Sequence, residues 1–94
     1  MADKKEYLTG KTPSGFSFRI DRDVLDDWEL FEDIDKVDGG DLSALMRVLN
    51  ALLGEKQKSA LKEHCRKDGR VSAKAMMVEL KEIFVAAGEQ TKNS

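Results

Sequence analysis

Glycine-containing breaks divide most of this chain into short segments, and apolar residues recur at helical spacing within each segment. The breaks fall at 38–41, Gly54, 68–69 and Gly88. Glycine is strongly favoured just beyond the end of a helix. The positions of these breaks therefore predict four helices, over about 22–37, 41–53, 55–67 and 72–87.

The residues before the first predicted helix alternate between apolar and polar. Phe16, Phe18 and Ile20 share one face of an extended segment, and a stretch containing Pro13 separates it from an earlier strand-like run. This pattern predicts a β-hairpin over about 5–20. A lone hairpin is not stable in water, so its apolar face should lie on the helices.

The fold class expected is therefore α+β, mainly α. At 94 residues the chain should form a single domain over 1–94. Polar composition predicts that 1–4 and 89–94 are disordered. We expect the core to centre on seven large apolar residues: Phe16, Phe18, Trp28, Leu45, Leu49, Leu80 and Phe84.

The first predicted helix can begin at Asp21 or Asp23, whose side chains suit a helix N-terminus. Val24, Trp28 and Phe31 fall on one face at about 100° per residue, so Trp28 is predicted to anchor this helix in the core. Leu30 and Val37 fall outside this face. The helix should therefore either pack on two sides, which we favour, or keep an apolar flank for a partner.

Charge is distributed unevenly along the chain. Residues 1–46 carry 6 Lys and Arg against 12 Asp and Glu, whereas residues 47–94 carry 10 against 6, and together they give the net charge of −2. Basic residues gather on the third predicted helix and at its exit, at Lys56, Lys58, Lys62, Arg66, Lys67 and Arg70. The acidic half of one copy could attract this strip on another copy.

Residues with reactive side chains are few. His64 and Cys65 are the only histidine and the only cysteine. Adjacent residues on a helix point about 100° apart, so these two are poorly placed to act together, and ligands for a zinc site are lacking. The acidic run Asp33–Asp41 has the wrong register for a calcium loop. We expect no catalytic residue, no metal and no cofactor.

The composition also limits the compartment and the partners. A single cysteine cannot form an internal disulfide and suits a reducing cytoplasm. Neither a signal peptide nor a membrane span is expected, because the N-terminal residues are polar and the longest apolar stretch is interrupted by polar residues. The acidic balance argues against general binding to nucleic acid.

Two stretches of the chain suggest a family. The first is Thr12–Asp21 leading into Leu25–Leu30, and the second is Leu52–Lys58 leading into Leu61–His64. Over residues 12–87 the chain resembles the small tail assembly chaperones of long-tailed bacteriophages and prophages of Gram-positive bacteria.

The resemblance implies a non-enzymatic function in phage assembly. Such a chaperone would bind the tape measure protein, keep it soluble and help to recruit tail-tube subunits. It would act in the cytoplasm of the bacterial host and would be absent from the mature virion. Many weak contacts along one long helical protein would suit this role.

The candidate partner-binding residues fall into two groups. Leu30 and Val37 are expected to provide apolar docking. Self-association would place Asp26, Glu29 and Asp33 opposite Lys62, Arg66 and Arg70. The alternative is a small nucleic-acid-associated regulatory protein that uses the basic third helix, which steep salt dependence of DNA binding would identify.

Overall fold

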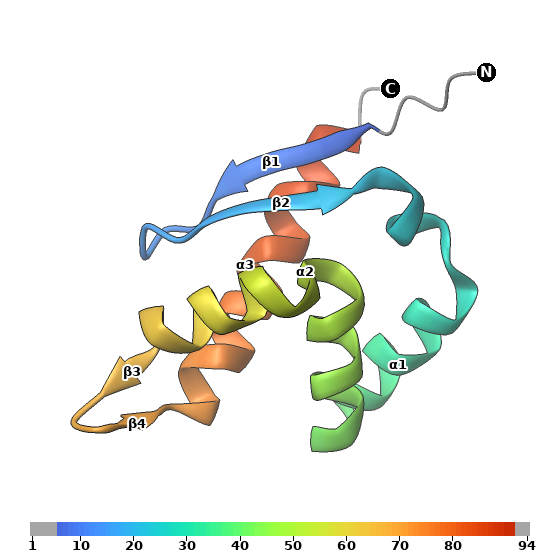
Figure 1. The fold of residues 1–94 in the computed structure, drawn as a ribbon. Helices are drawn as coiled ribbons and strands as arrows, with labels where there is room; N and C mark the ends of the chain where they lie inside the picture. Colours follow the sequence, from blue (N-terminus) through green and yellow to red (C-terminus); the bar gives the residue numbers. More distant parts are fainter. Residues whose placement is uncertain (1–5, 92–94) are drawn as a thin grey trace.

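The computed structural model describes residues 6–91. Its elements follow in the order β1 (Tyr7–Lys11), β2 (Ser17–Asp21), the 3₁₀ helix η1 (Arg22–Asp26), α1 (Trp28–Asp38), α2 (Leu42–His64), β3 (Arg66–Lys67), β4 (Arg70–Val71) and α3 (Ala73–Thr91) (Figure 1). The predicted α+β, mainly helical class is confirmed. The described residues form three α-helices rather than the predicted four.

The N-terminal hairpin is confirmed. β1 and β2 pair antiparallel, with Leu8 opposite Ile20 and Gly10 opposite Phe18. The side chains of Leu8, Phe18 and Ile20 are buried, whereas Thr9 and Arg19 face outward, as the alternation requires. β1 packs against α3 and β2 against α2, so the hairpin covers both helices (Figure 1).

Gln57 fastens β2 to α2. Its side-chain amide oxygen accepts a hydrogen bond of 2.7 Å from the Arg19 N–H, and its amide nitrogen donates one of 2.7 Å to the Arg19 carbonyl. The same nitrogen donates to the Leu53 carbonyl at 3.0 Å. Gln57 thus satisfies backbone groups that a strand at the edge of a sheet would otherwise leave open.

The segment 22–37 is not one helix, which corrects the prediction. Asp21 caps η1 by accepting a hydrogen bond from the Asp23 N–H, the backbone is extended at Asp27, and Asp27 caps α1 by accepting one from the Glu29 N–H. The break shifts the helical register, so Val24 and Trp28 do not share a helix face.

Trp28 is therefore not a core residue. Its side chain is 73% exposed, whereas Leu30 and Val37 are buried at 3% and 7%. The helix does not pack on two sides. It keeps an apolar flank at the surface, but this flank consists of Trp28 and Phe31 rather than Leu30 and Val37.

The predicted boundary at Gly54 is a kink within α2. Gly54 has φ 73° and ψ 172°, a conformation open almost only to glycine, and the helix changes direction there (Figure 1). Asp41 caps the start of α2, as predicted, by accepting a hydrogen bond of 3.1 Å from the Ala44 N–H. The helix ends at His64 rather than at Lys67.

A second hairpin, β3–β4, follows α2 and was not predicted. Asp68 and Gly69 both have positive φ, 55° and 86°, as the two central residues of a type I′ turn require. Asp-Gly favours this turn, but the flanking strands span only Arg66–Lys67 and Arg70–Val71. They are too short to show an alternating pattern.

The last helix was predicted well at its start. Ser72 accepts a hydrogen bond of 3.1 Å from the Ala75 N–H and so caps α3. Gly88 does not end this helix, because α3 continues to Thr91, and glycine costs only about 1 kcal/mol relative to alanine inside a helix. Residues 1–5 and 92–94, which include most of the termini predicted to be disordered, lie outside the described residues.

The core lies where the hairpin, α2 and α3 meet. Its most deeply buried large side chains are Ile20, Val48, Leu61 and Ile83. Of the seven residues predicted to be central, Phe16, Phe18, Leu45, Leu49 and Leu80 are buried. Phe84 is half-buried, and Trp28 lies at the surface.

We predict that Gly54→Ala destabilises the fold by about 1–3 kcal/mol, because the kink would hold alanine in a backbone conformation that only glycine adopts readily. A Cβ at Gly54 would meet no other atom within 4 Å, so the cost would come from the backbone alone. Urea unfolding measures the change.

Gly88→Ala is the matched control for Gly54→Ala. Its Cβ would also meet no atom within 4 Å, but Gly88 lies inside α3, where alanine should stabilise by about 0.5–1 kcal/mol. Equal effects of the two substitutions would contradict the kink.

Candidate interaction surfaces

The first candidate surface is on α1 and is called the aromatic face. It consists of Trp28 and Phe31, whose side chains are 73% and 48% exposed. The Trp28 indole N–H donates a hydrogen bond of 3.0 Å to Glu32, one turn further along the helix. The aromatic face is therefore positioned on the outer side of α1 and flanked by carboxylates.

The second candidate surface is a groove between the first part of α2, the part of α2 beyond Gly54, and the start of α3. We call it the α2–α3 groove, and its volume is about 400 Å³. Its apolar lining consists of Leu42, Leu45, Met46, Leu49, Val71, Ala73 and Met76, and its polar lining of Asn50, Lys58 and Lys62.

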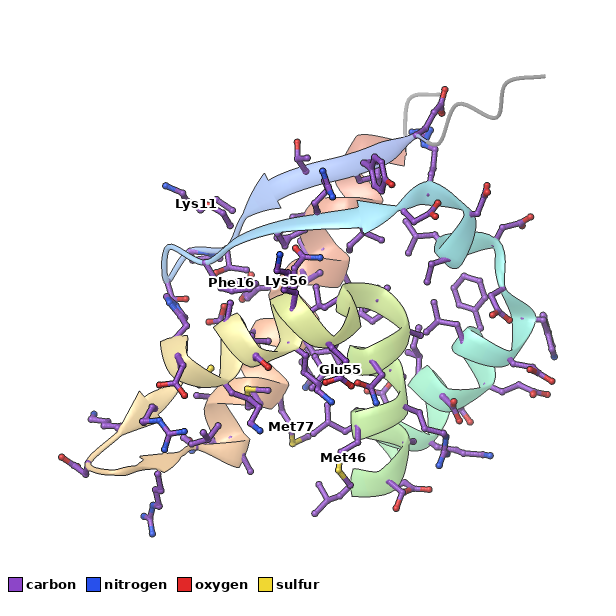
Figure 2. All side chains as sticks on the ribbon, viewed as in Figure 1. Lys11, Phe16, Met46, Glu55, Lys56 and Met77 are labelled. Atoms are coloured by element: carbon purple, nitrogen blue, oxygen red, sulfur yellow. The ribbon has the colours of Figure 1, made fainter. Side chains whose placement is uncertain are left out.

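Two groove residues are unusually accessible for their size. Leu42 is 57% and Met46 59% exposed, and Figure 2 shows Met46 projecting from the part of α2 furthest from the N-terminal hairpin. Methionine adapts its shape readily to a partner. Exposed apolar side chains that line a groove are typical of a protein-binding surface.

The predicted apolar docking residues do not lie on either surface. Leu30 and Val37 belong to the core, so they are not accessible to a partner. A single helix over 22–37 would have its main apolar face at Val24, Trp28 and Phe31, but α1 begins at Trp28 and buries the face that carries Leu30 and Val37. The residues that sequence reasoning missed are Leu42 and Met46, which share a stripe with the buried Leu45 and Leu49.

Two of the predicted self-association charges are engaged within the chain. The Arg47 guanidinium donates hydrogen bonds of 3.1 and 2.9 Å to Asp33, which joins α2 to α1 and lowers the pKa of the Asp33 carboxyl. Arg66 donates hydrogen bonds of 3.1 and 3.0 Å to Glu63, and these lower the pKa of Glu63.

The remaining predicted charges lie at separate places on the surface. Asp26 is at the end of η1, Glu29 is in the first turn of α1, Lys62 is on the rim of the α2–α3 groove, and Arg70 is on β4. All four side chains are exposed. The fold therefore keeps an acidic side on α1 and a basic side on the later part of α2 and on β3–β4.

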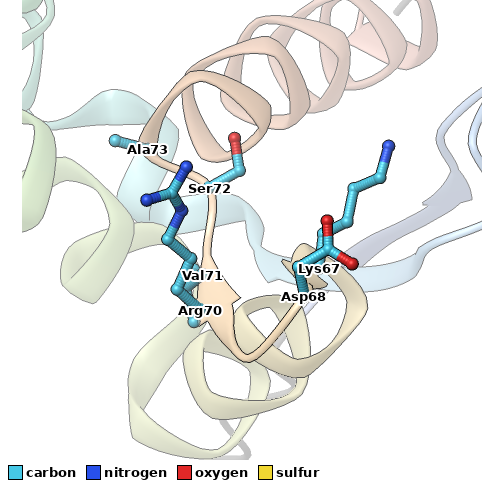
Figure 3. A pocket seen from close by; sticks show the side chains of 6 residues that line it. All are labelled: Lys67, Asp68, Arg70, Val71, Ser72 and Ala73. Carbon is cyan, nitrogen blue, oxygen red and sulfur yellow. The ribbon is translucent and has the colours of Figure 1, made fainter.

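The basic hairpin borders a small hollow at the start of α3. Lys67, Asp68, Arg70, Val71, Ser72 and Ala73 line it, and its volume is about 310 Å³. Figure 3 shows Lys67 and Asp68 on one side of the β-turn and Arg70 on the other. The positive charges therefore diverge and do not converge on one point.

A polar cluster joins the turn of the first hairpin to α3. Glu79 is only 5% exposed, and its carboxylate accepts hydrogen bonds of 2.8 Å from Thr12 and 2.7 Å from Ser14. The Ser14 hydroxyl oxygen also lies 2.8 Å from His64 Nε2. Because Glu79 contacts the serine and not the imidazole, the arrangement differs from a Ser-His-carboxylate triad.

Cys65 lies beside this cluster and is buried. Burial raises the pKa of the Cys65 thiol, and the negative charge of Glu79 raises it further. A raised pKa keeps the thiol protonated, and the thiolate is the reactive form. The environment of Cys65 therefore suppresses its nucleophilicity.

Residues 6–91 were also searched for groups of metal-binding side chains and for helices that could cross a membrane. Within this range, no three His, Cys, Asp or Glu side chains are grouped so that they could hold a metal ion. None of the helices in the same range combines the length and the apolar character that crossing a membrane requires.

Comparisons with protein-family models, with curated proteins and with solved structures find no match to this chain.

We predict that Glu79→Ala destabilises the fold by about 1–3 kcal/mol, because the buried Thr12 hydroxyl would lose its acceptor. Thermal and urea unfolding measure the loss. Glu82→Ala, one turn further along the same helix, is the control and should change stability by much less. An equal effect of both substitutions would show that the polar cluster does not hold the hairpin.

We predict that Cys65 reacts more slowly with an alkylating reagent at pH 8 in the folded protein than in urea. Because the pKa of the thiol is raised in the folded state, this state binds the thiol proton more tightly than the unfolded state does. The stability that this difference contributes is complete below the pKa of an unfolded cysteine, about 8.5, and is lost as the pH rises toward the higher pKa of the folded state. Equal alkylation rates in the two states would contradict the burial.

Proposed function

We propose that this protein is a non-enzymatic phage tail assembly chaperone that binds the tape measure protein and helps to recruit tail-tube subunits. The observation that supports the proposal is the amount of apolar side chain at the surface of so small a domain. Trp28 and Phe31 on α1, Leu42 and Met46 on α2, and Val78 and Val85 on α3 are each between 48% and 73% exposed.

The physical requirement of the role agrees with this surface. A tape measure protein presents long apolar helical surface until tube subunits surround it, so a chaperone must cover that surface reversibly. Amphipathic helices bind to apolar faces through side chains three, four and seven residues apart. Val78 and Val85 are seven residues apart on α3, so they share one face and suit a helical partner.

The stretches that carry the family resemblance support the proposal in a second way. Thr12–Asp21 contains the hairpin turn and β2, and Leu52–Lys58 contains the kink at Gly54 and the Gln57 contact with β2. These stretches build the frame of the fold. The resemblance thus concerns residues that join the hairpin to α2 and α3.

The proposed role fixes the setting in which the protein works. It acts in the cytoplasm of the bacterial host, on newly made tape measure protein, and leaves before the tail is complete. Each contact is weak enough for tube subunits to displace it, and many contacts along one rod give strong binding in sum.

Co-expression with the tape measure protein of the same phage genome tests the proposal. We predict that the tape measure protein becomes soluble and copurifies with this chain, and that it aggregates when expressed alone. An unrelated small acidic protein is the control. A tape measure protein that stays insoluble in the presence of this chain would contradict the proposal.

A variant tests the part played by α3. Val78→Glu/Val85→Glu places charge on the outer face of this helix and should reduce the copurified tape measure protein at least severalfold, because charged side chains resist burial. Circular dichroism checks that the variant folds. An unchanged amount of copurified tape measure protein would show that the outer face of α3 is not the binding surface.

The basic β3–β4 hairpin favours a second candidate function. It places Arg66, Lys67 and Arg70 within a short exposed segment, which suits a small nucleic-acid-associated regulatory protein. DNA binding that weakens steeply with salt would support this candidate. The pairing of Arg66 with Glu63 and the acidic α1 make it the weaker of the two.

A further inference from the structure

The chain carries two complementary surfaces that cannot meet within one molecule. The aromatic face lies on α1, and α1 contributes no residue to the α2–α3 groove. Figure 1 shows α1 on the opposite side of the first part of α2 from the β3–β4 hairpin. The aromatic face therefore does not border the groove of its own chain.

The apolar chemistry of the two surfaces matches. The aromatic face offers two large rings, Trp28 and Phe31, which project from a helix. The α2–α3 groove offers about 400 Å³ lined by leucine and methionine side chains. Methionine sulfur makes favourable contacts with aromatic rings, and its flexible side chain can adjust to them.

The charges also match. Glu29, Glu32 and Asp35 lie on the exposed part of α1 beside the aromatic rings, together with the basic Lys36, so this part of α1 is net negative. Lys58 and Lys62 lie on the rim of the groove. Among the described residues, Lys62 forms no salt bridge, and the Lys58 ammonium lies 3.3 Å from Glu55, itself an exposed residue. The rim therefore keeps positive charge for an acidic partner.

We propose that a second copy of this chain occupies the groove, with Trp28 and Phe31 of one protomer inserted into the α2–α3 groove of the next. The carboxylates of α1 then face Lys58 and Lys62. This contact covers the aromatic face and the groove and leaves Val78 and Val85 exposed on α3.

The geometry of such an interface is head to tail. Each protomer uses a different surface toward each neighbour, so a bound pair still has one free aromatic face and one free groove. Contacts of this kind continue into open chains or close into rings. Because one helix face and one groove make a small contact, the association is weak and depends on concentration.

Sedimentation velocity and multi-angle light scattering over the micromolar to millimolar range test the proposal. The average mass of the native chain should rise with concentration and fall again at high salt, which screens the charge pairs. Trp28→Ala/Phe31→Ala removes the aromatic face, and Met46→Glu places a charge in the groove. Each variant should weaken association at least tenfold.

Val85→Glu is the matched control for Met46→Glu. Both residues are 59% exposed on a helix, but Val85 lies outside both surfaces. The control should associate like the native chain. Circular dichroism checks that every variant is folded, since all the altered side chains lie at the surface.

Mixing the variants distinguishes insertion of the aromatic face into the groove from a contact between two like surfaces. Trp28→Ala/Phe31→Ala keeps its groove and Met46→Glu keeps its aromatic face, so an equimolar mixture should form heterodimers but nothing larger. A native chain that stays monomeric at all concentrations, or a mixture without heterodimers, would overturn the proposal. Equal weakening by Val85→Glu would also overturn it.

Discussion

The kink at Gly54 determines how α1, α2 and the N-terminal hairpin fit together. A straight helix from Leu42 to His64 could not lie against both α1 and β2. With φ at 73°, Gly54 turns the chain so that the first part of α2 packs on α1 and the later part lies under β2. The α2–α3 groove exists because the two parts of α2 diverge from this residue.

The hairpin depends on the same kink. Gln57 reaches the backbone of β2 at Arg19 only because the helix restarts just after Gly54. At the other end of the hairpin, Glu79 of α3 holds the turn through Thr12 and Ser14. The two polar contacts fix the hairpin over the apolar side chains of α2 and α3, which supply most of the burial.

Much of the fold could be predicted because its signals are local. The alternation at Phe16, Phe18 and Ile20, the cap at Ser72 and the break at Gly54 each depend on neighbouring residues, and the structure has all of them. The predictions were wrong where contacts between distant parts of the chain, rather than neighbouring residues, determine the local structure. One extended residue, Asp27, changed the register of α1, and the strands of β3–β4 were too short to produce a pattern.

The candidate surfaces were harder to predict than the fold. Trp28 is the type of residue most often placed in a core, and only the break at Asp27 puts it outside. Leu42 and Met46 belong to the same apolar stripe as the buried Leu45 and Leu49. The spacing defines the stripe but does not show which part of it other elements of the fold will cover. The charge reversal along the chain did survive as an acidic α1 and a basic later region.

Sequencing the DNA that flanks the gene is the most direct test of the proposed role in tail assembly. Chaperones of the family that the chain resembles commonly have a second, longer product made by ribosomal frameshifting. For this role we expect a tail-tube gene upstream, a slippery run of nucleotides near the end of this gene at which ribosomes can change frame, and a very long helix-coding frame downstream. An isolated gene beside transcriptional regulators would contradict the proposed role and would favour the nucleic-acid function.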